Sequence, residues 1–232
     1  MIILLCLCLF AFSPTSAHAL SIYNQNIFGH PINKIFSRLE TMAKFIDQTQ
    51  PDIVTLQEVF FPSYLKHFPD SYQAYFTQHG PYIRAGLVTL VKKSLTTSNY
   101  SFTPFSNQGN IFSLQLTDRL LQKGFQQICI DGSNFCLTNT HLTANYFGST
   151  NYTTQLSQTK HILSSPTNLL IGDFNFPTNS NPFNLVTLHL SLVTSHSLDH
   201  AFTSLPLASS SSQIINLSPP VSDHSGFFLT FP

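Results

Sequence analysis

Apolar residues recur along this chain with two different periods. In residues 32–48 they return every three or four positions, which predicts an amphipathic helix, and residues 153–163 have the same spacing. Apolar runs of strand composition cover residues 20–28, 53–56, 85–91, 111–116, 125–130, 134–140, 168–171 and 227–231. Many strands with few helices favour a layered α/β fold.

The chain ends differ from this pattern. Residues 205–220 are rich in serine and proline, which predicts a long flexible loop before the last strand. Residues 1–19 form an apolar run that ends in Ala17-His18-Ala19, which is typical of a signal peptide cleaved near Ala19. We therefore expect one catalytic domain over residues 20–232 in a secreted or periplasmic protein. An N-terminal anchor or a buried helix is the alternative for residues 1–19.

Two cysteines belong to the expected mature chain, Cys129 and Cys136. An Asp-Gly turn lies between their strand-like flanks, so the two thiols can face each other across a hairpin. In an oxidising compartment such a pair forms a disulfide. Two free buried thiols are the alternative.

Charge narrows the choice of partners. The chain has ten Lys and Arg residues and ten Asp and Glu residues, so its formal net charge is zero. The chain therefore has no general positive field to attract a polyanion, which weakens the hypothesis that it binds nucleic acid.

Several strand-like runs end in polar residues. Asn26, Glu58 and His141 each lie at the end of such a run, and Asp173 and Asn175 follow another. Loops at the strand ends of α/β folds carry ligands and catalytic groups, because the sheet holds them rigidly while they stay accessible. The sequence therefore predicts an active site at one edge of the sheets.

These polar residues belong to six ordered motifs that resemble the endonuclease/exonuclease/phosphatase superfamily. The motifs are Asn26-Ile27-Phe28-Gly29, Gln57-Glu58-Val59, Thr140-His141, Gly172-Asp173-Phe174-Asn175, Asp199-His200-Ala201-Phe202 and Ser222-Asp223-His224. The resemblance covers nearly all of the expected mature chain. It implies a four-layered α/β sandwich, in which two mixed β-sheets pack face to face with helices outside.

The resemblance also implies a role for each site residue. Glu58 and Asn26 would hold a divalent cation, Mg²⁺ or in its place Mn²⁺, with Asp223 close to the same site. His224 would activate water as the general base. Asp199 would fix the tautomer of this base. Asp173 and Asn175 would orient the nucleophile, and His141 would donate a hydrogen bond to a phosphate oxygen.

The sequence leaves two assignments open: which asparagine binds the metal, and whether His200 has a role. Asn24 lies two residues before Asn26 and points to the same face of a strand, so it competes for the metal. Asn26 is preferred because Ile27-Phe28-Gly29 follows it as in the family. His200 follows Asp199 where many members carry an aromatic or apolar residue, and we expect no catalytic role for it.

The substrate is predicted from fewer features. Three segments resemble the neutral-sphingomyelinase-like branch: Asn26-Ile27-Phe28-Gly29-His30-Pro31, Lys123-Gly124-Phe125 and His141-Leu142-Thr143-Ala144-Asn145-Tyr146. This resemblance implies phospholipase C-type cleavage of a phospholipid head group and peripheral contact with a membrane. A secreted deoxyribonuclease-like endonuclease is the alternative, with nucleic acid as its substrate. A non-enzymatic binding module is the third, and the complete set of site residues argues against it. The oligomeric state is left open.

Overall fold

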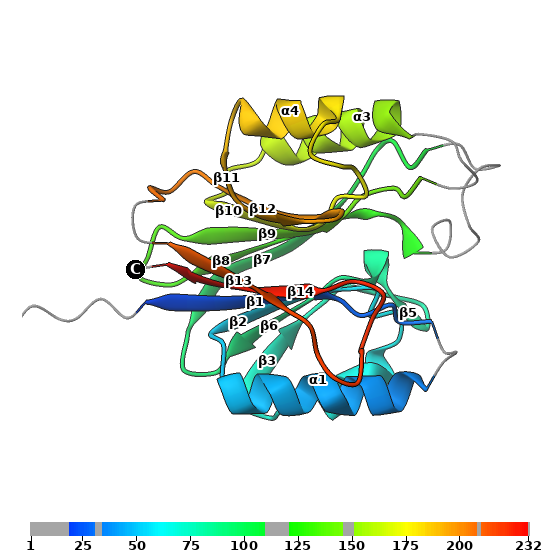
Figure 1. Ribbon diagram of the computed structural model, residues 1–232, viewed down its shortest axis with the longest axis vertical. Coiled ribbons are helices and arrows are strands. Elements are labelled where there is room, and N and C mark those ends of the chain that lie inside the picture. Colours follow the sequence, from blue (N-terminus) through cyan, green and yellow to red (C-terminus); the bar gives the residue numbers. More distant parts are fainter. Residues whose placement is uncertain (1–18, 31–33, 110–120, 146–150, 208–209, 232) are drawn as a thin grey trace, which may run out of the picture.

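The computed structural model describes residues 19–30, 34–109, 121–145, 151–207 and 210–231. Within them, two six-stranded sheets lie face to face, and helices cover the outer face of each sheet (Figure 1). The molecule is therefore a four-layered α/β sandwich, which confirms the predicted fold class. None of the helices in these ranges is long and apolar enough to cross a membrane.

The first sheet is mixed, because β1 runs parallel to β2 and antiparallel to β14. In spatial order its strands are β13 (Ser211–Ile215), β14 (Gly226–Phe231), β1 (Leu20–Asn26), β2 (Ile53–Gln57), β6 (Val88–Lys92) and β3 (Tyr72–Tyr75). A separate two-stranded sheet pairs β4 (Gln78–His79) with β5 (Tyr82–Ile83).

The second sheet is also mixed, with β10 parallel to β9 and antiparallel to β12. Its strands, in spatial order, are β11 (Ser191–His196), β12 (Asp199–Thr203), β10 (Leu169–Asp173), β9 (Cys136–His141), β8 (Gly124–Ile130) and β7 (Thr97–Pro104).

Three apolar layers hold the sandwich together. Helix α1 (Ile35–Thr49) packs Leu39 and Met42 on the first sheet. Helices α3 (Tyr152–Leu163) and α4 (Asn181–Thr187) cover the second sheet with a layer rich in phenylalanine. The third layer lies between the sheets. Two 3₁₀ helices, η1 (Pro62–His67) and η2 (Arg84–Gly86), complete the described elements.

The structure corrects the predicted elements at three places. The expected flexible loop at 205–220 contains β13, whose exposed polar residues pair with β14. The expected strand at 85–91 begins as η2, because Ala85 and Gly86 both have positive φ, and becomes β6 only at Val88. Strands β3, β7 and β11 and helix α4 were not predicted. The expected strand at 111–116 and all but the last residue of the expected signal peptide over residues 1–19 lie outside the described residues.

A disulfide joins Cys129 to Cys136, as one of the two readings of the sequence predicts. The two cysteines are paired directly across β8 and β9. Gly132 takes the positive φ that the connecting turn requires.

Candidate active site

The side chains between the two sheets change from apolar at one end of the strands to polar at the other. Side chains on a strand alternate between its two faces, so every second residue points to the partner sheet. At one end the inward positions belong to the apolar layer, including Ile22 on β1 and Leu169 on β10. At the other end the inward positions are polar: Asn26 on β1, Gln57 on β2, His141 on β9, Asp173 on β10 and Asp199 on β12. The strand alternation therefore brings the predicted polar strand ends to one edge.

His224 and Asp199 form the shortest polar contact at this edge. His224 Nδ1 donates to Asp199 Oδ2 at 2.6 Å, which leaves Nε2 directed at Asp173 Oδ2 from 4.0 Å. Burial alone would lower the pKa of His224, but the hydrogen bond to Asp199 and the charges of Asp173, Asp199 and Asp223 together raise it to about 10. The hydrogen bond to a buried carboxylate thus fixes the orientation of the ring, with Nε2 facing Asp173.

Asp173 lies at the centre of the polar cluster. Its Oδ2 accepts from Asn26 Nδ2 at 2.9 Å and lies 3.5 Å from His141 Nε2. Its Oδ1 accepts from the backbone N–H of Asn175 at 2.9 Å. The residue before Asp173 must be glycine, because a Cβ on Gly172 would lie 2.0 Å from the carbonyl oxygen of Thr140 on the neighbouring strand. Asp173 therefore links both sheets and both histidines.

Asn175 follows Asp173 in a left-handed conformation, with φ of 54°. Its Nδ2 donates to the carbonyl of Leu142, and its own carbonyl accepts from Gln155 Nε2 at 2.9 Å and from Asn145 Nδ2 at 3.2 Å. Such contacts hold a strained backbone position in place. Helix α3 thus fixes the loop that carries Asn175.

Glu58 leaves β2 with a positive φ of 60° and is largely buried. The turn admits only glycine beside it, since a Cβ on Gly29 would lie 1.7 Å from the carbonyl oxygen of Glu58. Burial is the main cause that raises the pKa of Glu58, with a smaller contribution from Asp173, while the charge of Lys123 and the hydrogen bond from Asn26 act in the opposite direction. Its Oε2 has no hydrogen-bond partner among the described residues.

The donor set around Glu58 fits a hard divalent cation. One oxygen or nitrogen from each of Glu58, His141 and Asp173 lies within 4.8 Å of the others, and the unpartnered Glu58 Oε2 is available as a ligand. A second such group consists of Asp173, Asp199 and His224. The two groups share Asp173, so a cation there would lie between the sheets.

The structure separates the two asparagines. Asn26 Nδ2 contacts Asp173 Oδ2 and also Glu58 Oε1 at 3.2 Å, whereas Asn24 Oδ1 accepts from Thr55 and Gln57 deeper between the sheets. In this orientation Asn26 turns its amide nitrogen to the carboxylates, and its Oδ1 accepts from Phe28 N. Ligation through Oδ1 therefore requires rotation of the amide.

Asp223 lies apart from the ligand groups. Its side chain is exposed, accepts from Ser222 Oγ at 3.2 Å, and belongs to neither cluster of ligand atoms in the described part of the chain. Its charge reaches Arg38 and His224. The structure thus brings together seven of the eight predicted site residues and leaves Asp223 at their edge.

Lys123 is a site residue that the sequence reasoning did not assign. It is 3% exposed, and its charge acts on both Glu58 and His141. Burial and the charges of Lys123 and His224 lower the pKa of His141 well below its usual value, so the contact of His141 with Asp173 is no ion pair. The sequence signal was a lysine directly before a strand, in the Lys123-Gly124-Phe125 segment.

His200 lies outside the polar cluster. Its Nε2 lies 2.8 Å from the carbonyl oxygen of Phe176, so this nitrogen donates and Nδ1 accepts from Ser195 Oγ at 2.9 Å. The ring packs among phenylalanines beneath the helices. His200 therefore contacts the apolar layer rather than Asp173 or Glu58.

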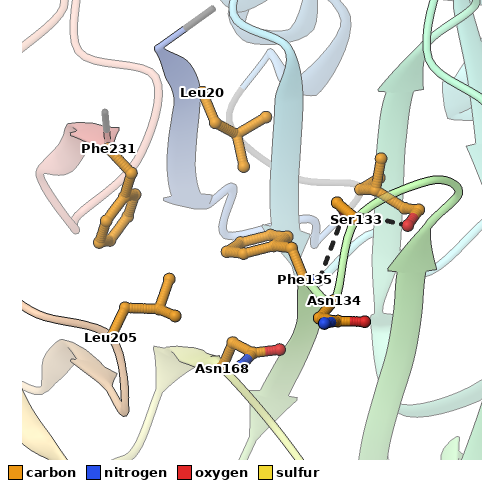
Figure 2. A pocket seen from close by; sticks show the side chains of 8 residues that line it. Leu20, Ser133, Asn134, Phe135, Asn168, Leu205 and Phe231 are labelled. Carbon is orange, nitrogen blue, oxygen red and sulfur yellow. Dashed lines mark hydrogen bonds between the residues drawn. The ribbon is translucent and has the colours of Figure 1, made fainter. Parts of the chain in front are cut away.

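An apolar cavity of about 400 Å³ lies at the opposite end of the same strands. Leu20, Phe135, Leu205 and Phe231 point toward one another around it, with Asn168 at its edge (Figure 2). Asn26 is six residues along β1 from Leu20, about 20 Å at strand spacing. This cavity contains none of the predicted site residues.

Comparison with known proteins agrees with the fold and the motifs. A family model described as the Endonuclease/Exonuclease/phosphatase family matches residues 24–224. No curated protein matches the chain.

Similar solved structures share the fold at low identity. SmcL is 16% identical with a TM-score of 0.74, and 93% of this chain covers 99% of it. D. rerio TDP2 complexed with a single-strand DNA product is 18% identical, with a TM-score of 0.70 and the same coverage. Sphingomyelinase C from Streptomyces griseocarneus is 15% identical, with a TM-score of 0.70 and coverage of 92% and 99%. The chain belongs to the endonuclease/exonuclease/phosphatase family of phosphoester hydrolases.

Proposed function

We propose that this chain is a Mg²⁺-dependent phosphodiester hydrolase that removes the head group of a phospholipid, in the manner of a phospholipase C. The contact between His224 and Asp199, at 2.6 Å beside Asp173, is the observation that carries the proposal. A histidine oriented by one carboxylate and facing another is suited to deprotonating a water molecule next to a bound phosphate.

Glu58 and Asp173 would hold the cation, with Asn26 after rotation of its amide and Asp223 at the edge. Carboxylate and amide oxygens are the ligands that Mg²⁺ prefers, and Mn²⁺ takes the same donors. When bound, the cation would offset the carboxylate charge that raises the pKa of His224 and would stabilise charge on the leaving oxygen.

The side chains of the site would activate and orient the attacking water and bind the phosphate. His224 Nε2 accepts the proton of the attacking water, and Asp199 stabilises the resulting imidazolium. Asp173 and Asn175, fixed to each other by a 2.9 Å hydrogen bond, orient that water. His141 is kept neutral by burial and donates a ring N–H to a non-bridging phosphate oxygen.

A lipid substrate is supported by local and general features. The sequence of residues 141–146 resembles a His-Leu-x-Ala-x-Tyr pattern of the sphingomyelinase-like branch, and in the structure Asn145 donates to the carbonyl of Asn175. The net charge of zero gives no broad attraction to a polyanion. The similar structures include sphingomyelinase C from Streptomyces griseocarneus.

A nuclease activity is the second candidate. The observation that favours it is the structural similarity to D. rerio TDP2 complexed with a single-strand DNA product. Nucleic-acid binding depends on several phosphate contacts, so it weakens steeply as salt increases. Salt dependence therefore separates the two candidates.

Export of the protein is part of the same proposal. Residues 1–19 would be removed as a signal peptide, and residues 20–232 would act outside the cytosol and touch a membrane peripherally. The disulfide between Cys129 and Cys136 supports this, because disulfides persist in oxidising compartments. Mass spectrometry of the exported protein tests it, since an N-terminus at Leu20 is expected.

One comparative assay tests the substrate. Protein comprising residues 20–232 is incubated with Mg²⁺ and, separately, with sphingomyelin, lysophospholipid or plasmid DNA, with His224→Ala as the inactive control. Release of phosphocholine by the unsubstituted protein alone is expected. Nicking of plasmid without lipid turnover would favour the nuclease, and activity that persists in EDTA would contradict the metal.

A further inference from the structure

Two buried amide side chains meet between the sheets, directly beneath the candidate site. Gln57 Nε2 on β2 donates to Asn139 Oδ1 on β9 at 2.8 Å and to Asn24 Oδ1 on β1 at 2.9 Å. Asn139 Nδ2 in turn donates to the carbonyl oxygens of Leu56 and Val88, both in the first sheet. The Gln57–Asn139 pair is therefore a polar connection across the sandwich.

Each member of this network is next to a site residue in the chain. Gln57 directly precedes Glu58, Asn139 lies two residues before His141, and Asn24 lies two residues before Asn26. Two residues on a strand span about 7 Å and keep the same facing. Displacement of β2 relative to β9 at this level would thus move Glu58 relative to His141.

The network does not maximise stability. Asn24, Gln57 and Asn139 are all fully buried, yet Asn24 Nδ2 and Gln57 Oε1 have no hydrogen-bond partner among the described residues. A buried donor or acceptor without a partner destabilises the fold, and an apolar side chain of similar shape avoids this cost. Packing alone would therefore favour apolar residues at these positions.

From these contacts we propose that Gln57 and Asn139 are positioning residues. Their hydrogen bond sets the distance between the half of the site that carries Asn26 and Glu58 and the half that carries His141 and Asp173. This rests on the proposed function in one respect: the two halves must act on the same phosphate. Neither amide contacts the substrate in this proposal.

A second polar connection between the sheets provides a matched control. Thr89 Oγ1 on β6 donates to Gln126 Oε1 on β8 at 3.0 Å, and Gln126 Nε2 donates to the carbonyl of Leu87. Both side chains are buried, and they lie on strands that carry none of the predicted site residues. This pair crosses the sandwich in the same way but does not join the two halves of the site.

The experiment compares Gln57→Met, Asn139→Leu and their double variant with Thr89→Val and Gln126→Met. Melting temperature, kcat and KM are measured with Mg²⁺ and bis(4-nitrophenyl) phosphate. We expect kcat to fall by about 10- to 100-fold in each site-side variant, with little change in KM. The melting temperature should fall as well, because each single substitution leaves a buried partner without its hydrogen bond. The double variant should be no worse than the singles, because either substitution already removes the link. The control variants should lose melting temperature and keep kcat.

The outcomes that overturn the proposal are specific. An unchanged kcat in Gln57→Met, or an equal loss of kcat in the control variants, would contradict a positioning role. A crystal structure of Gln57→Met tests the geometry without turnover: the 2.9 Å separation between Asn26 Nδ2 and Asp173 Oδ2 should increase, and an unchanged separation would contradict the proposal. Absence of turnover in the unsubstituted protein would contradict the proposed function instead.

Discussion

The two ends of the space between the sheets are formed by the same strands and filled by opposite kinds of residue. Around the cavity, Leu20, Phe135 and Phe231 face one another, and a disulfide closes the adjacent hairpin. At the other end, Glu58, Asp173 and Asp199 place three carboxylates in one cluster. The first arrangement stabilises the fold, and the second destabilises it.

The direction of the pKa shifts records this difference. Burial and the charge of Asp173 raise the pKa of Asp199 to about 7, although His224 acts in the opposite direction. Glu58 is shifted upward as well, mainly by burial. Carboxylates with raised pKa values cost stability when they are ionised. The candidate site is therefore held in place by the surrounding sheets. We expect substitutions in the site to lower activity without lowering stability, and substitutions at the apolar end to change stability without changing activity.

The largest expected effect is the loss of activity in His224→Ala. Removing a general base lowers kcat by about 10²- to 10⁴-fold. Turnover of bis(4-nitrophenyl) phosphate measures this effect, and His189→Ala, at an exposed histidine that belongs to none of the six motifs, is the control. If His224→Ala kept full activity, the assignment of the base would be wrong.

Replacing Glu58 by Gln should separate stability from function. The substitution removes a buried charge close to Asp173 and an acceptor that has no partner among the described residues. Burial raises the pKa of Glu58, so its ionised form costs stability, and removing this charge should raise the melting temperature in EDTA by a few degrees. Calorimetry should at the same time detect weaker binding of Mg²⁺. A lower melting temperature in EDTA would show that Glu58 stabilises the fold.

Much of the contrast between the two ends could be predicted from the sequence. The strands that carry Glu58, His141 and Asp173 are short apolar runs that end in a polar residue, and both features are local. The hairpin with Cys129 and Cys136 is local too, because the turn and both cysteines lie within eight residues. The family resemblance then supplied the layer order, which no local pattern contains.

What could not be predicted depends on which strands face each other. The hydrogen bond between Gln57 and Asn139 joins residues 82 positions apart in different sheets, and no periodicity reports such a pairing. The burial of Lys123 has the same origin. The sequence predicts a loop where β13 lies, because an edge strand pairs through its backbone and tolerates polar side chains. Such features require the assembled sandwich.

The disulfide tests the cavity end without disturbing the site. The bond closes a loop of seven residues, and for this length the chain-entropy model gives about 2 kcal/mol of stabilisation. A Cys129→Ser/Cys136→Ser variant should melt about 4–8 °C lower and keep its kcat, because β8 and β9 remain paired along their length. A loss of kcat beyond the change in folded fraction would mean that the two ends are coupled.

The smallest expected effect comes from filling the cavity. Leu205 is half-buried and lines it together with Leu20 and Phe231, so Leu205→Phe adds apolar volume where about 400 Å³ is open. Cavity filling commonly adds about 0.5–2 kcal/mol of stability, which corresponds to a rise of about 1–8 °C in melting temperature. Activity should not change, since none of the predicted site residues lines this space. A lower melting temperature would mean that the cavity walls cannot move apart to accept the ring, whereas a changed kcat would show that packing at the apolar end reaches the carboxylates along β1 and β10.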